Sequence, residues 1–151
     1  MITRLFEPVS IGPLTLANRV VMTAMHLNYT PKGEVTDQFV NFYAARARGG
    51  TGLIIIGGAA IDEQASGLDL FLSIMDDRYI PGLARLTDVI HKEASKIAVQ
   101  LYMAGAYSYC GLQGLPIPAP SECTSLFTRQ DRKSTRLNSS HGLLSRMPSS
   151  A

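Results

Sequence analysis

Three short apolar runs divide the chain, at residues 19–22, 53–56 and 97–102. The second run contains no polar residue, and continuous apolar runs of this length are typical of strands in a parallel sheet that is buried on both faces. Helical patterns lie between the runs, so the expected order is strand, helix, strand, helix, strand. This order requires parallel pairing of the strands through crossover connections.

Two amphipathic helices are predicted between the strands. The first begins after Thr36, a suitable N-cap, and the pair Gly49 and Gly50 should end it. Its predicted core face consists of Phe39, Val40, Tyr43, Ala44 and Ala47. The second starts near Asp76 and Asp77. Its predicted core stripe consists of Ile80, Leu83, Leu86, Thr87, Ile90 and Ala94.

Residues 9–16, with Gly12 and Pro13 in the middle, predict a short hairpin suited to close the bottom of a barrel. The strands start near residues 19, 53 and 97, which gives repeats of 34 and 44 residues. A (β/α)₈ barrel of ~250 residues has about 31 residues per unit, so only three of its eight strands fit here. Spacing alone leaves an open, doubly wound sheet equally possible.

Composition narrows the class of protein. The 151 residues are 46% hydrophobic, which is typical of one ordinary globular domain. A formal net charge of +2 is too small to indicate a nucleic-acid or membrane partner. The N-terminus has no apolar signal region, and no apolar stretch is long enough to cross a bilayer, so we expect a cytoplasmic protein. Cys110 and Cys123 show neither a disulfide framework nor a metal-binding pattern.

Candidate ligand-binding residues follow the first two apolar runs, because ligands gather at the C-terminal ends of parallel strands. Residues 23–26 offer small side chains and backbone groups that suit the edge of a flat heterocycle such as a flavin, with Met25 packing on its ring. Gly57 and Gly58 permit close approach of a ligand to the backbone. The alternative for both segments is an ordinary turn, with His26 in solvent.

Gln100 interrupts the third apolar run. A buried amide without partners costs roughly 1–3 kcal/mol, so we expect Gln100 to be buried and hydrogen-bonded. Its side chain presents a donor beside an acceptor, which matches the pyrimidine edge of a flavin. The alternative is a barrel-interior glutamine bonded to neighbouring backbone.

The segments 18–26, 42–48 and 96–101 closely resemble the old yellow enzyme family, most of all its NADH:flavin oxidoreductase and 2,4-dienoyl-CoA reductase branch. The resemblance implies an α/β fold, a partial TIM (β/α)₈ barrel with an N-terminal hairpin and the first three βα units. It also implies FMN as cofactor, and leaves the catalytic residues unknown. The FMN contacts implied by the family are Thr23, Ala24, Met25, His26, Gly58 and Gln100.

The family further implies an oxidoreductase that takes hydride from NADH or NADPH, passes it through flavin N5 and reduces the activated C=C bond of an enoyl or enone substrate. We expect the chain to be an N-terminal fragment of such an enzyme and inactive alone. The alternative is a truncated half-barrel that acts only by association with a partner or with itself, since an open third strand invites pairing. A homo-oligomer is compatible with either reading.

The chain departs from the family pattern after the third strand, where Met103 and Ala106 replace a His and an Arg. Ala94 and Ser95 stand where the family tends to have glycines, and a non-glycine residue in a left-handed cap costs about 1 kcal/mol. We expect residues 1–130 to form the N-terminal part of an FMN-binding barrel. Residues 131–151 are rich in serine and lack apolar periodicity, which predicts a disordered, non-native tail.

Overall fold

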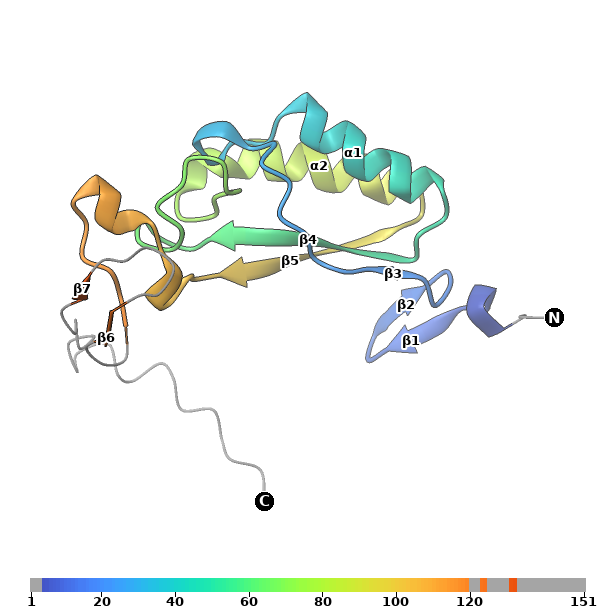
Figure 1. Ribbon diagram of the computed structural model, residues 1–151. Coiled ribbons are helices and arrows are strands. Elements are labelled where there is room, and N and C mark those ends of the chain that lie inside the picture. Colours follow the sequence, from blue (N-terminus) through green and yellow to red (C-terminus); the bar gives the residue numbers. More distant parts are fainter. Residues whose placement is uncertain (1–3, 120–122, 125–130, 133–151) are drawn as a thin grey trace, which may run out of the picture. The chain divides into compact units, whose positions relative to one another are not determined.

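A computed structural model describes residues 4–119, 123–124 and 131–132 of the chain (Figure 1). The chain divides into two compact units. One unit comprises Met1–Asp62 with Asp69–Tyr102, and the other comprises Glu63–Leu68 with Met103–Ala151. The predicted tail lies outside the described residues except for positions 131–132, so its disorder stays a prediction.

The first unit contains the predicted parallel sheet, of β3 (Val21–Met22), β4 (Leu53–Ala60) and β5 (Lys96–Tyr102). Both neighbouring pairs are parallel, and β4 lies between β3 and β5. β4 is twice as long as the predicted strand, because its pairing with β5 resumes after Gly57 and Gly58. β3 is shorter than predicted and comprises two residues only.

The predicted hairpin is confirmed, with β1 (Val9–Ile11) antiparallel to β2 (Leu14–Leu16). Gly12 adopts a φ of +55° at its turn, a conformation that glycine takes without steric cost. Short 3₁₀ turns occupy Arg4–Phe6, Pro31–Gly33 and Asp77–Tyr79.

Helix α1 (Asp37–Arg48) follows the sequence prediction closely. The Thr36 hydroxyl accepts a hydrogen bond from the Phe39 amide at 3.2 Å and so caps the first turn. All five residues of its predicted core face are buried. Gly49 is the C-cap, as predicted.

Helix α2 (Ile80–Lys92) begins after a 3₁₀ turn that the Asp76 side chain caps by accepting from the Arg78 amide. Leu86 and Ile90 are buried as predicted. Two members of the predicted stripe are wrong: Ile80 is 55% exposed, and Ala94 lies beyond the end of the helix. The buried face of α2 is therefore shorter than the predicted stripe, because the stripe extends from the first residue of α2 to a position beyond its end.

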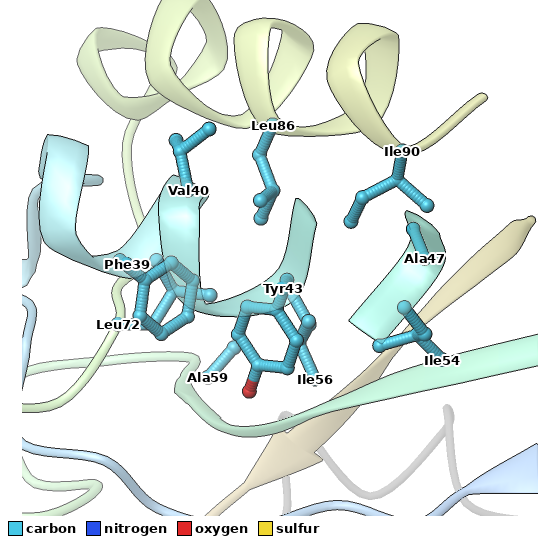
Figure 2. Packing of buried hydrophobic residues seen from close by; sticks show 10 residues of the cluster. All are labelled: Phe39, Val40, Tyr43, Ala47, Ile54, Ile56, Ala59, Leu72, Leu86 and Ile90. Atoms are coloured by element: carbon cyan, nitrogen blue, oxygen red, sulfur yellow. The ribbon is translucent and has the colours of Figure 1, made fainter. Parts of the chain in front are cut away.

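The two helices cover the same face of the sheet, and the core lies between them and the strands (Figure 1). Figure 2 shows Val40, Leu86 and Ile90 from the helices above Ile54 and Ile56 of β4. Since alternate residues of a strand point to opposite faces, Ile54 and Ile56 line the helical side, while Leu53 and Ile55 lie on the other.

Strand β5 is the exposed side of this sheet. Val99 is 41% exposed and Leu101 is 64% exposed. Between β5 and α2 lies a hollow of about 350 Å³, partly lined by Leu83, Thr87 and Val99. Among the described strands, β5 pairs with β4 only.

The second unit has 3₁₀ turns at Gly105–Tyr107 and Cys110–Gln113 and a two-residue antiparallel pairing of β6 (Cys123–Thr124) with β7 (Asp131–Arg132). The Cys110 thiol is free and buried, with its sulfur 3.4 Å from the Pro116 carbonyl oxygen. Ser108 anchors this segment by donating a 2.7 Å hydrogen bond to the Gln64 carbonyl.

Candidate functional site

The C-terminal ends of β3, β4 and β5 form one edge of the sheet, because all three strands run in the same direction. We call this edge the rim, and it comprises the residues that the sequence predicted: Thr23, Ala24, Met25, His26, Gly58 and Gln100. The register sets their relative heights, with Met22 opposite Ile54 and Ile54 opposite Ile97.

A β-bulge lies at the centre of the rim. Ile56 pairs with Val99 and Ala59 pairs with Leu101, so Gly57 and Gly58 together stand opposite the single residue Gln100. Two residues opposite one define a bulge, and bulges occur often beside functional sites. Gly58 has a φ of +53°, which a residue with a side chain adopts only at a cost.

Gly57 lets the segment after β3 lie directly against β4. A Cβ atom at Gly57 would lie 2.6 Å from the Met25 amide nitrogen and closer still to its carbonyl group. Only glycine permits this approach of the two backbones. The fold thus brings Met25 and the glycine pair together, as the sequence predicted.

The Gln100 side chain is exposed, so the prediction that it is buried and hydrogen-bonded is wrong. Its position on the face of the sheet away from the helices explains the difference, since α1 and α2 both cover the other face. Ile97 packs against the core below the helices, so by alternation Gln100 lies on the opposite face of β5. No hydrogen bond of its amide is found among the described residues, so the amide can take a ligand.

The other rim residues differ in exposure. Met25 is 46% exposed, Thr23 is also exposed, and Ala24 is half-buried. His26 is exposed, and its Nε2 atom shares a hydrogen bond with the Oδ1 atom of Asn28, which adopts a φ of +55°. The solvated His26 of the ordinary-turn alternative is thus partly right, although the ring has polar and aromatic contacts.

Aromatic stacking at the rim was not predicted. The His26 ring stacks on Phe71 at 3.7 Å between centroids, and Phe71 stacks on Tyr102 at 4.9 Å. One signal in the sequence points to it, because the aromatic residue Tyr102 ends an apolar run. Phe71 lies in a segment without periodicity, so no pattern could have placed it there.

Tyr43 of α1 is a second feature that the sequence did not indicate, beyond its membership of a core face. Its side chain is fully buried, and its hydroxyl has no hydrogen-bond partner among the described residues. Figure 2 shows the hydroxyl directed past Ile56 and Ala59 of β4. Burial raises the pKa of Tyr43, against smaller lowering effects of the nearby Gly57 amide and of the Arg46 charge. The amide lies close to the hydroxyl without meeting hydrogen-bond geometry.

A metal site and a membrane-spanning helix are both absent from the part of the chain that the structure describes. There, no three His, Cys, Asp or Glu side chains gather in a way that could hold a metal ion. None of the helices in that part combines the length and apolar character needed to cross a bilayer.

Comparison with known proteins gives consistent relatives. A family model described as the NADH:flavin oxidoreductase / NADH oxidase family matches residues 4–143. A metal reductase of Desulforamulus reducens is 52% identical over 124 residues, covering 82% of this chain and 18% of that protein. An NADPH dehydrogenase of Bacillus subtilis is 37% identical over 107 residues, covering 70% of this chain and 32% of that protein.

A solved structure is also similar to this chain. The crystal structure of Old Yellow Enzyme from a Pichia species superposes with a TM-score of 0.74 at 27% identity, covering 82% of this chain and 33% of that one. The chain therefore spans a third or less of the length of these three relatives.

Proposed function

Because the chain belongs to the NADH:flavin oxidoreductase / NADH oxidase family, which includes old yellow enzyme, we propose that its rim holds FMN for the oxidation of NADH or NADPH. The observation that carries the proposal is the bulge, which sets two residues without side chains opposite the exposed amide of Gln100. The amide of Gln100 can meet the polar edge of a flat ring that lies at the rim.

The residues of the rim fit a flavin in three respects. Gln100 offers a donor and an acceptor that no described residue uses. The half-exposed Met25 side chain supplies a soft apolar contact for one face of the ring. Thr23 and Ala24 supply backbone groups and little bulk beside it.

When bound, FMN supplies a two-electron carrier that can pass hydride from a nicotinamide to an acceptor. The chain's own part is to bind and orient the cofactor at the rim. We propose that the acceptor is the electron-poor C=C bond of an enoyl or enone. The Bacillus subtilis relative, an NADPH dehydrogenase, supports a reduced nicotinamide as donor.

Titration of the purified chain with FMN, followed by quenching of flavin fluorescence, tests the proposal. The chain should bind FMN, and Gln100→Leu should weaken binding about tenfold, as expected for loss of one or two buried hydrogen bonds. Gln113→Leu is the matched control, since Gln113 is an exposed glutamine of the other unit. Equal affinity of the parent chain and of Gln100→Leu for FMN would show that Gln100 does not contact the cofactor.

The same preparation tests whether the chain acts without further protein. We propose that it binds FMN but does not oxidise NADH or NADPH with an enone present, as the sequence predicted. Turnover measured as loss of nicotinamide absorbance would contradict this.

The exposed side of the sheet favours a second candidate, a non-catalytic half-barrel that associates through β5. The observation is the pair Val99 and Leu101, apolar side chains exposed on a strand whose outer edge no described strand covers. Light scattering separates the candidates. A monomer with bound FMN supports the first, and an FMN-free oligomer supports the second.

A further inference from the structure

The three stacked rings of His26, Phe71 and Tyr102 form a row that we call the rim stack. The interplanar angles are 18° for the first pair and 21° for the second, so the rings are close to parallel. Stacked aromatic pairs stabilise their arrangement beyond the area they bury. Of these three residues, only His26 belongs to the rim as defined above.

Each ring of the rim stack follows or ends a different strand of the sheet. His26 follows β3, and Tyr102 is the last residue of β5. Phe71 follows β4 and is held to it by its neighbours, since the Ala60 amide donates to the Leu72 carbonyl at 2.7 Å and Ser73 pairs with Ala60. The rim stack therefore ties together the C-terminal ends of all three strands.

Phe71 also covers the bulge. A Cβ atom at Gly58 would lie 3.2 Å from Cε1 and 3.3 Å from Cδ1 of the Phe71 ring. The ring thus fills the space that a side chain at Gly58 would need. Contact on this side opposes any change in the left-handed backbone of Gly58, whose φ is +53°.

We propose that Phe71 is a positioning residue: clamped between His26 and Tyr102, it fixes Gly58 in its left-handed conformation and so aligns the strand ends that receive the cofactor. The part of this inference that concerns FMN rests on the proposed function. The clamp itself is a property of the protein without ligand. It can therefore be measured separately.

The test uses the full chain, with Phe71→Leu to remove the ring and Phe71→Tyr to retain it. Phe6→Leu is the matched control, because Phe6 is 68% exposed and lies outside the rim stack. NMR without flavin reports the ring protons of His26, which the face of Phe71 shifts upfield, and the exchange rate of the Gly58 amide. Fluorescence titration then gives the dissociation constant for FMN.

In Phe71→Leu, the His26 signals should move downfield, Gly58 should exchange about tenfold faster, and FMN should bind about tenfold more weakly, as expected for the loss of two stacked contacts. Phe71→Tyr and Phe6→Leu should resemble the parent chain. If Phe71→Leu does not fold, Tyr102→Leu removes the outer ring, and the same three readouts decide.

Unchanged His26 signals and Gly58 exchange in the leucine variant would overturn the clamp. Altered signals with unchanged FMN affinity would overturn its positioning role. A parent chain that binds no FMN would sink the proposed function, and with it the role toward the cofactor. That failure is distinguishable, because the ligand-free readouts would still respond to Phe71→Leu.

Discussion

Ala94 is the residue at which the backbone departs most plainly from what its side chain prefers. Its φ of +60° lies in the left-handed region, two residues after the end of α2 and two residues before the start of β5. Non-glycine residues adopt this region at a cost of about 1 kcal/mol. The strain was predicted from the resemblance to the family, which tends to have glycines at positions 94 and 95.

Ala94→Gly should raise the free energy of unfolding by up to about 1 kcal/mol, because glycine takes a positive φ freely. Ala45→Gly, at an exposed position within α1, should lower it by about the same amount, because glycine is a poor helix former. Urea denaturation followed by circular dichroism measures both. A loss of stability in Ala94→Gly would contradict the assignment of strain.

Tyr43 carries a pH dependence. Its pKa in the folded protein is raised above 10.0 by burial, so the unfolded chain releases the phenol proton first. The contribution of the protonated Tyr43 to the free energy of unfolding is therefore fully present below about pH 10. It is lost as the pH rises toward the raised pKa. The orphaned hydroxyl also gives no hydrogen-bond stabilisation at neutral pH.

Tyr43→Phe should unfold at higher pH than the parent chain, and at neutral pH it should be as stable or about 1 kcal/mol more stable, because the buried hydroxyl has no hydrogen-bond partner among the described residues. Urea titrations at a series of alkaline pH values measure the difference. An alkaline transition that does not move would show that another group controls it.

Among the elements, β4 shows that a local pattern of apolar residues and glycines does not set where a strand ends. The second apolar run predicts a strand that ends before Gly57 and Gly58, whereas the strand passes through them and pairs again at Ala59. Periodicity and glycine content describe a segment by itself. A bulge exists only relative to the partner strand, so β5 decided it.

Gly57→Ala should destabilise the chain by roughly 2 kcal/mol or more, because the new methyl group would overlap the backbone of Met25 rather than a movable side chain. Gly50→Ala gives the matched control. There the added methyl group meets no atom within 4 Å, and the cost should come only from the φ of +90°. Thermal unfolding measures the stability of both variants. Equal losses of stability would mean that the backbone of Met25 can move away from a methyl group at position 57.

At the scale of the whole molecule, the partial TIM barrel predicted by family resemblance is confirmed, and the open doubly wound sheet is set aside. The superposition with the Old Yellow Enzyme structure covers 82% of this chain. The boundary predicted at residue 130 stays a prediction, and the family match extends beyond it to residue 143.

If the chain associates through β5, as the second candidate requires, Leu101→Lys should reduce the association, because a charge on an exposed edge strand disfavours pairing with a second strand. Leu112→Lys, which also replaces an exposed leucine but lies outside β5, should leave the assembly state unchanged. Size-exclusion chromatography with light scattering at several concentrations measures the effect. Equal association of both variants would exclude β5 as the contact.

The elements and the family could be predicted from the sequence alone. The cap at Thr36 and the core face of α1 depend on contacts within a few residues, which local pattern records. The exposure of Gln100, the bulge opposite it and the stacking of Phe71 between His26 and Tyr102 became visible only in the folded chain. These features depend on which segments become neighbours across the sheet, and no single segment carries that information.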